Sequence, residues 1–147
     1  TAYQMPRCVW SSDVCSSDPR EAPPEDLRAR MRAPEGDAFL HVTALHLADG
    51  QPFVYEDRWI DVTTVPEALR QDFTAISANE WLVLNSPFTR GEIAFSALAA
   101  SAEVAGHLGC APGAAIFVIE RATFDGERPI TAVRQFFPPG YRMQTSL

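Results

Sequence analysis

The stretch FDGERPITAVRQFFPPGYRM, residues 124–143, joins a turn signal to a strand pattern with one arginine and a Pro-Pro-Gly stop. The stretch LADGQPFVYEDRWI, residues 47–60, follows the same plan. In both, Asp-Gly and a nearby proline precede a run rich in aromatic and β-branched residues, which is typical of a β-hairpin. The chain therefore encodes one kind of hairpin twice, and this repetition decides the predicted fold.

The repeat extends upstream of both hairpins, over residues 24–60 and 101–137. Each copy predicts an amphipathic helix, a proline-glycine stop, a strand, an Asp-Gly turn and a second strand. The two ranges have the same length and the same order of elements, so two versions of one unit related by pseudo-symmetry are expected. We predict an α+β fold, with an internally duplicated antiparallel sheet and helices on one face. The predicted strand pairs are 39–47 with 52–60 and 115–124 with 129–137.

The segment between the copies predicts two further helices at PEALRQDF (66–73) and ANEWLVLN (78–85), followed by a strand at GEIAFSALAA (91–100). By symmetry, a strand should also precede the first copy. Residues 1–18 stand there, and they show neither helical nor strand periodicity. Either this leader supplies the strand or the strand is missing. We expect it to be missing, with a disordered or non-native leader and a domain that comprises residues 19–147.

The composition limits the classes of partner. The chain has 147 residues, a hydrophobic fraction of 46% and a formal net charge of −7. Phosphate contacts require a basic patch, so this acidic balance argues against a nucleic-acid or anionic-membrane surface. No apolar run is long enough to span a membrane, and no secretory signal pattern is visible. Three cysteines without metal-type spacing fit a reduced, cytoplasmic setting.

The charges within strands are the strongest chemical signal, because none of the common catalytic motifs is found in the sequence. Glu56 and Arg58 are two residues apart and so share a face of the sheet, whereas Asp57 points away. Such charges must reach solvent or line a polar cavity. An open, hydrated sheet face and a cavity for a small polar ligand both fit this pattern. His41 and His46 lie five apart on one strand, point to opposite faces and cannot bind one metal together.

The position of His46 relative to this charged pair depends on the first turn. An odd-length loop places even-numbered residues of both strands on one face, so that His46 lies near the pair. A two-residue loop instead places His41 across from Arg58. We expect the cavity on the face that carries Glu56 and Arg58, with His46 nearby.

Three stretches carry a family resemblance: VTALHLADGQPFVYEDRWI, DFTAISANEWLVLNSPFTRGEIAFSA and LGCAPGAAIFVIERATFDGERPITAVRQFFPPGYRM. Together they resemble the effector-sensing UTRA domain of GntR-family transcription regulators, in particular the histidine-utilisation repressor branch. The resemblance implies a chorismate-lyase-like α+β fold, a small-molecule effector and a homodimer. It also implies that operator DNA is bound through a winged helix-turn-helix domain, whose pattern is not found in residues 1–38.

The resembled branch responds to urocanate, which is a carboxylate joined to an imidazole. We expect Arg58 to bind the carboxylate and Glu56 to accept an imidazole N–H. Sugar-phosphate-sensing relatives carry phosphate-binding arginines at the positions of Ala44 and His46, which argues against a phosphosugar here. No catalytic residue, cofactor or metal is expected. The predicted ligand-binding residues are His46, Glu56, Arg58, Thr89, Glu92, Thr131, Arg134, Phe137 and Tyr141.

Two other classes of function fit the same fold. One is an enzyme of the chorismate-lyase-like fold, because a fold does not determine a function. The other is a dimerisation module that binds no ligand. Titration with urocanate, histidine and chorismate would separate these two classes from the expected sensing domain, because only a ligand that binds the native state stabilises it.

Overall fold

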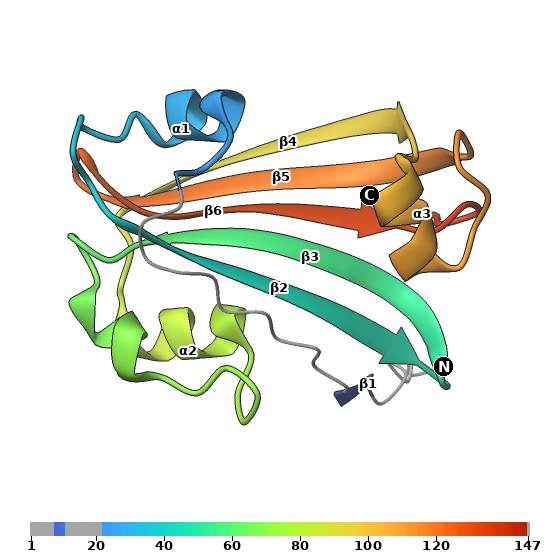
Figure 1. The fold of residues 1–147 in the computed structure, drawn as a ribbon, viewed down its shortest axis with the longest axis horizontal. Helices are drawn as coiled ribbons and strands as arrows, with labels where there is room; N and C mark the ends of the chain where they lie inside the picture. Colours follow the sequence, from blue (N-terminus) through green and yellow to red (C-terminus); the bar gives the residue numbers. More distant parts are fainter. Residues whose placement is uncertain (1–7, 11–21, 147) are drawn as a thin grey trace.

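The computed structural model describes residues 8–10 and 22–146. An antiparallel sheet of six strands forms its centre, in the order β1-β2-β3-β6-β5-β4 (Figure 1). The strands are β1 (Cys8–Trp10), β2 (Phe39–Ala48), β3 (Gln51–Asp61), β4 (Arg90–Ala99), β5 (Ala115–Asp125) and β6 (Arg128–Phe137). The helices are α1 (Glu25–Met31), the 3₁₀ helix η1 (Pro66–Arg70), α2 (Ala78–Asn85) and α3 (Ala102–Leu108). The α+β class and the antiparallel sheet are as predicted.

The internal duplication is visible in the positions of the elements. α1 and α3 begin at equivalent positions of the two sequence repeats, and each is followed by a hairpin. The hairpins join through β3 and β6, where Asp57 lies opposite Arg134. These two residues are themselves equivalent positions of the repeats, so the pseudo-two-fold axis passes between them. Both predicted strand pairs are confirmed.

The two turns differ in detail. The first is the two-residue turn Asp49-Gly50, in which both residues have positive φ (51° and 76°), as a type I′ turn requires. In the second hairpin Asp125 still belongs to β5, and the turn consists of Gly126, with φ 57°, and Glu127. Glycine adopts this left-handed conformation without the strain that a side chain would add.

A β-bulge in each hairpin changes the register that a two-residue turn imposes. In the first hairpin Phe53 is the extra residue, and His46 pairs with Val54. Even-numbered residues of β2 and β3 therefore share a face, and His46 lies on the same side as Glu56. Ile130, the repeat equivalent of Phe53, is the extra residue of the second hairpin. The arrangement expected for an odd-length loop is thus found, although the loop has two residues.

Helices cover both faces of the sheet, not the single face that we expected. α1 and α3 pack on one face, which we call face B, over two apolar clusters. α2 and η1 lie against the opposite face, face A, over a third cluster that includes Ile60 and Trp81. Leu27 and Met31 of α1, four residues apart, are fully buried, as the amphipathic pattern predicts. None of the helices in the described residues is long and apolar enough to cross a membrane.

The strand that we expected to be missing is present in a short form. β1 pairs with β2, with Cys8 opposite Ala48 and Trp10 opposite His46. It occupies the edge that corresponds to β4 in the other half of the sheet, but it has three residues where β4 has ten. The expectation of a missing strand is therefore wrong. The rest of the predicted leader, residues 1–7 and 11–18, lies outside the described residues.

Asp61 is the last residue of β3, and its side chain is fully buried. Its Oδ1 accepts hydrogen bonds from the backbone N–H groups of Thr63 and Thr64, at 2.8 and 3.0 Å. Burial raises the pKa of Asp61 to about 6; these backbone hydrogen bonds oppose the shift, and the neighbouring Asp37 carboxyl adds to it. Between about pH 4 and pH 6 the native state therefore holds a proton that the unfolded chain has released.

We predict that Asp61→Asn removes a pH dependence of stability. Because the folded pKa is raised, the contribution of Asp61 is present below about pH 4 and is lost as the pH rises to about 6, by roughly 3 kcal/mol at most. Urea denaturation measures the free energy of unfolding at each pH. The value for wild type, relative to Asp61→Asn, should therefore fall as the pH rises from about 4 to about 6. Asp125→Asn, at the exposed last residue of β5, is the control. A constant difference between wild type and Asp61→Asn would contradict the assignment.

Candidate functional site

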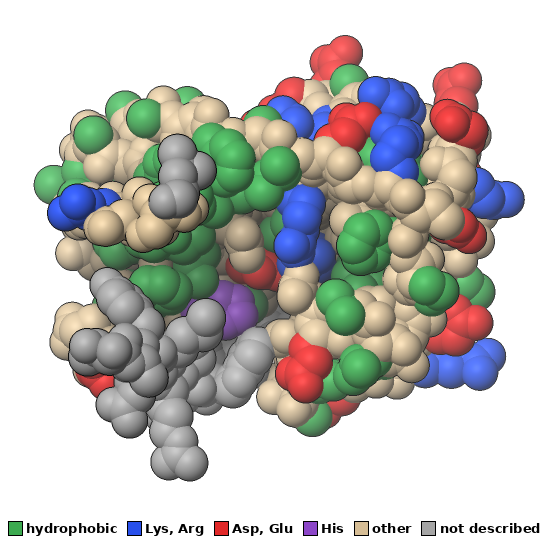
Figure 2. All heavy atoms as spheres, turned by 180° about the vertical axis from the view of Figure 1, so that it is seen from behind, with side chains coloured by type: hydrophobic (Ala, Val, Ile, Leu, Met, Phe, Trp, Pro, Cys, Tyr) green, Lys and Arg blue, Asp and Glu red, His purple; other side chains and the backbone are tan. Residues whose placement is uncertain are grey.

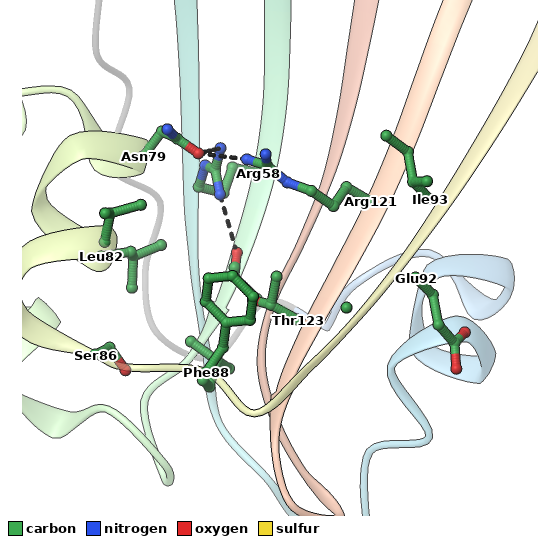
Figure 3. Close-up of a pocket in the computed structure, with 13 residues that line it drawn as sticks. Arg58, Asn79, Leu82, Ser86, Phe88, Glu92, Ile93, Arg121 and Thr123 are labelled. Carbon is green, nitrogen blue, oxygen red and sulfur yellow. Dashed lines mark hydrogen bonds between the residues drawn. The ribbon is translucent and has the colours of Figure 1, made fainter.

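Face A contains a hollow in which arginine, acidic and histidine side chains lie between apolar ones (Figure 2). Two cavities adjoin there. The first cavity has a volume of about 270 Å³ and lies between α2 and β4 (Figure 3). The second cavity has a volume of about 310 Å³ and is lined by residues of β2, β3 and β6 and of the start of α2. Asn79 and Arg121 line both cavities, so the cavities meet at these two side chains.

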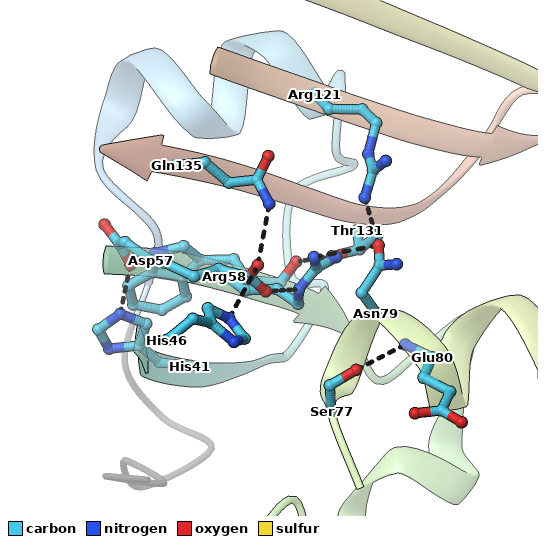
Figure 4. Close-up of polar contacts among 12 residues, drawn as sticks. His41, His46, Asp57, Arg58, Ser77, Asn79, Glu80, Arg121, Thr131 and Gln135 are labelled. Atoms are coloured by element: carbon cyan, nitrogen blue, oxygen red, sulfur yellow. Dashed lines mark hydrogen bonds and ion pairs between the residues drawn. The ribbon is translucent and has the colours of Figure 1, made fainter. Parts of the chain in front are cut away.

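The centre of the hollow is a buried ion pair on β3. Arg58 is 1% exposed and Glu56 is 5% exposed, and the Arg58 Nε–H donates to Glu56 Oε1 at 2.7 Å. The second carboxylate oxygen accepts from Gln135 Nε2 at 3.1 Å and lies 3.7 Å from His46 Nε2 (Figure 4). Burial alone would raise the pKa of Glu56, but the charge of Arg58 and hydrogen bonds from His46 and Arg58 hold it well below its usual range. The carboxylate is therefore ionised and neutralises one arginine.

Arg121 of β5 brings a second guanidinium group into the same hollow. It lies across β6 from Arg58, since Val133 is paired with both residues. Asn79 bridges the two groups, because its Oδ1 accepts from Nη2 of Arg58 at 3.5 Å and also from Nη2 of Arg121 (Figure 4). The Arg121 Nε–H is buried and has no hydrogen-bond acceptor among the described residues. The hollow thus holds an arginine donor that is not satisfied.

The charges of the hollow do not balance. Glu56 pairs with Arg58, whereas no carboxylate in the described part of the chain pairs with Arg121. Burial lowers the pKa of Arg121, and the neighbouring charge of Arg58 lowers it further, whereas the charge of Glu56 opposes the shift only in part. A bound anion would offset both effects and supply the missing acceptor. A planar carboxylate suits this position because it can accept two parallel hydrogen bonds from one guanidinium group.

The walls of the two cavities differ. Away from the two arginines, the lining of the first cavity is mainly apolar. Its apolar side chains are Leu82, Val83, Phe88, Ile93 and Ile130. The second cavity has a larger polar share than the first, and it is lined by His46, Glu56, Ser77, Asn79, Arg121 and Gln135 together with Phe53 and Val54. A small ligand can therefore keep an anionic group at Arg121 and extend in either direction.

Comparison with known proteins identifies the family. The family model of the UTRA domain matches residues 9–141. The chain belongs to the UTRA domain family. It is 33% identical to the histidine utilization repressor of Pseudomonas putida over 104 residues, which cover 71% of this chain and 42% of that protein. It is 31% identical to the histidine utilization repressor of Klebsiella aerogenes over 115 residues, which cover 78% and 48%. The chain thus spans less than half the length of these curated relatives.

Solved structures share the fold of this UTRA domain. The C-terminal domain of the histidine utilization repressor from Pseudomonas syringae pv. tomato str. DC3000 has a TM-score of 0.82 and 26% identity, with 96% of this chain and 99% of that chain covered. The effector domain of PhnF from Mycobacterium smegmatis has a TM-score of 0.71 and 18% identity, with 95% and 82% covered. At 18% identity the likeness shows the fold alone. The family resemblance expected from the sequence is confirmed.

The UTRA domain brings four of the predicted ligand-binding residues together in the hollow. Thr131 orients the ion pair, because its Oγ1 accepts from Nη1 of Arg58 at 3.5 Å and donates to a backbone carbonyl of β3 at 2.8 Å. Phe137 and Tyr141 adjoin the second cavity through Phe53, whose ring centroid lies 6.1 Å from each of theirs. The four residues in the hollow are His46, Glu56, Arg58 and Thr131.

The other three predicted residues contact the surrounding structure. Arg134 lies on face B, in ion pairs with α1 and, at 2.9 Å, with Glu120. Glu92 borders the first cavity, but its carboxylate points toward α1 (Figure 3) and pairs with Arg32 at 2.8 Å. Thr89 Oγ1 accepts from the backbone N–H of the second turn at 2.7 Å. The partners of these three side chains therefore lie away from Arg58 and Arg121.

His41 also lies on face B, opposite to His46, as the strand period predicts. Its Nε2 lies 2.6 Å from Asp57 Oδ1, and its ring stacks on Trp59 with centroids 4.1 Å apart. Within residues 8–10 and 22–146, no group of three or more His, Cys, Asp or Glu side chains is placed to hold a metal.

Arg121 and Asn79 line the hollow but were not predicted as site residues. The internal repeat contains a signal for Arg121, because this residue takes the place in the second hairpin that Ala44 takes in the first. Ala44 is an even-numbered residue of β2 and lies on face A. The equivalent position in the repeat would have placed Arg121 on face A, the face of Arg58. For Asn79 no comparable local signal exists, since the face that a helix covers depends on long-range packing.

We predict that Arg58→Met destabilises the domain by roughly 3–5 kcal/mol, because it leaves the ionised Glu56 buried without its main partner. Adding Glu56→Gln should recover part of the loss, since a neutral amide needs no opposite charge. Urea denaturation of both single variants and the double variant measures this coupling. Arg128→Met, at an exposed position of β6, is the control and should change stability by less than about 0.5 kcal/mol. Equal effects of Arg58→Met and Arg128→Met would contradict a buried ion pair.

Proposed function

We propose that this chain is the effector-binding domain of a transcriptional repressor of histidine utilisation, and that it senses a small imidazole carboxylate such as urocanate. The observation that carries this proposal is the surplus guanidinium group of Arg121 in a hollow where Glu56 already neutralises Arg58. The relatives that are named histidine utilization repressors support the regulatory role.

In this proposal the carboxylate of the ligand binds Arg121, with Arg58 beside it. Arg58 is already paired with Glu56, so the role expected for Arg58 passes largely to Arg121. The imidazole enters the second cavity, where Glu56 accepts a ring N–H, Gln135 lies within reach and Phe53 contacts the ring. A cavity of about 310 Å³ is at the lower end of the range for small-molecule sites, which suits a ligand of this size.

Regulation is better supported than catalysis, because the named relatives are repressors. The enzyme alternative predicts that the chain releases pyruvate from chorismate. The alternative of a dimerisation module predicts that none of the three test ligands stabilises the chain. Both alternatives are outcomes of the titration described below.

We also propose the partners of the whole protein. Operator DNA is bound through a separate winged helix-turn-helix domain in the cytoplasm, since a net charge of −7 gives this domain no general attraction for DNA. The domain pairs with a second copy. β4 is an outer strand of the sheet and exposes Ile93, Phe95 and Leu98 by 56, 54 and 51%, which favours association at this edge.

We predict that urocanate raises the melting temperature of the chain more than histidine or chorismate does. Arg121→Gln should weaken urocanate binding by roughly 10- to 100-fold in calorimetric titration, because a charge-assisted hydrogen bond to the carboxylate is lost. Arg134→Gln makes the same change on face B and should leave the affinity unchanged. Unaltered affinity in Arg121→Gln would remove this arginine from the site, and pyruvate release from chorismate would favour the enzyme alternative.

We predict that the chain alone forms dimers as its concentration rises and does not bind DNA. Sedimentation at low and high protein concentration measures the first property, and a gel shift with a candidate operator at low salt measures the second. A monomer at high concentration would contradict the proposed pairing. A salt-sensitive shift of the DNA would show that the domain itself contacts phosphates.

A further inference from the structure

The first cavity offers binding surface that the proposed imidazole ligand does not use. It has a volume of about 270 Å³ and ends at the guanidinium groups of Arg58 and Arg121 (Figure 3). Away from the arginines its walls are mainly apolar side chains from α2, from the loop after α2, from β4 and from the bulge of β6, with Ser86, Glu92 and Thr123 among them. The cavity therefore combines a cationic end with an apolar body.

Three of the wall residues are large, apolar and exposed. Val83 is 62% exposed, Phe88 54% and Ile93 56%. They come from α2, the loop that follows it and β4, and all three line the same cavity. A ligand in this cavity would remove apolar surface of three elements from water at once, which is favourable.

We propose that the first cavity binds monocarboxylates with an apolar aromatic or aliphatic body. The carboxylate binds Arg121 and Arg58, where positive charge is in excess, and the body lies against Leu82 and Ile93. A neutral head group would leave the charge excess in place. A strongly polar body would lose its hydration without gaining hydrogen bonds from the apolar walls.

This proposal shares Arg121 with the imidazole-carboxylate site but not the second cavity. Two carboxylates at one guanidinium group would repel each other, so the two classes of ligand should compete. The first cavity can bind an apolar acid whether or not an imidazole carboxylate is the effector. The two proposals are therefore tested separately.

Isothermal titration calorimetry of the full chain with 3-phenylpropanoate tests the proposal. We expect saturable binding of one ligand per chain, and a lower apparent affinity when urocanate is present. The uncharged probe 3-phenylpropanamide has the same body and should bind at least about tenfold more weakly.

Two variants test the position of the body. Ile93→Ser should weaken binding of 3-phenylpropanoate by about tenfold, because a branched apolar side chain is removed from the wall. Phe95→Ser is the matched control: Phe95 lies two residues along the same strand, is 54% exposed and does not line the cavity. Both positions are largely exposed, so both variants should fold, and thermal melting checks this.

Weaker binding of 3-phenylpropanoate in Ile93→Ser, with wild-type affinity in Phe95→Ser, supports the proposal. The absence of binding by wild type at millimolar ligand would overturn it. Equal affinity in wild type and Ile93→Ser would also overturn it, as would equal losses in the two variants. If 3-phenylpropanoate binds in the expected pattern and urocanate does not bind, the proposed site in the first cavity is supported and urocanate is ruled out as the effector.

Discussion

One extra residue in β3 determines which side chains share the hollow. A two-residue turn by itself would place His41 opposite Arg58. The bulge at Phe53 shifts the register by one residue, so that His46 faces the same way as the buried ion pair of β3. The equivalent bulge at Ile130 brings the odd-numbered side of β5 to the same face. The polar site therefore depends on two backbone irregularities that carry no charge themselves.

The charged residues divide into a structural pair and a surplus. Glu56 and Arg58 remove each other's charge, and their hydrogen bonds offset part of the cost of burying them. Arg121 has a buried donor without an acceptor among the described residues, a cost that a stable domain retains most readily where a ligand binds. Its neighbour Glu120 points to face B and pairs with Arg30 of α1 at 2.8 Å. Consecutive residues of β5 thus contact the hollow and the helix on the other face.

Features that are encoded locally could be predicted from the sequence. Asp-Gly turns, strand alternation and helical spacing lie within a few residues of one another, and they were sufficient for the hairpins, the three α-helices and the duplication. The helix predicted over residues 66–73 is a shorter 3₁₀ helix, Pro66–Arg70. The shared face of Glu56 and Arg58 followed from the two-residue period of a strand. The faces of Arg121 and Arg134 did not follow from this period alone, because they also require the register between strands or the equivalence of the two repeats. Arg134 was expected in the site and lies on face B, whereas Arg121 lies in the hollow. The side of the sheet that α2 covers depends on long-range packing of residues such as Trp81.

The central claim is that the arginines of face A bind the carboxylate of a small ligand. A crystal structure of the chain with urocanate tests this claim most directly. The account predicts a carboxylate oxygen within hydrogen-bonding distance, about 2.7–3.2 Å, of an Arg121 nitrogen, with the imidazole in the second cavity beside Glu56. Urocanate bound on face B, or on face A with its carboxylate away from both Arg58 and Arg121, would contradict it.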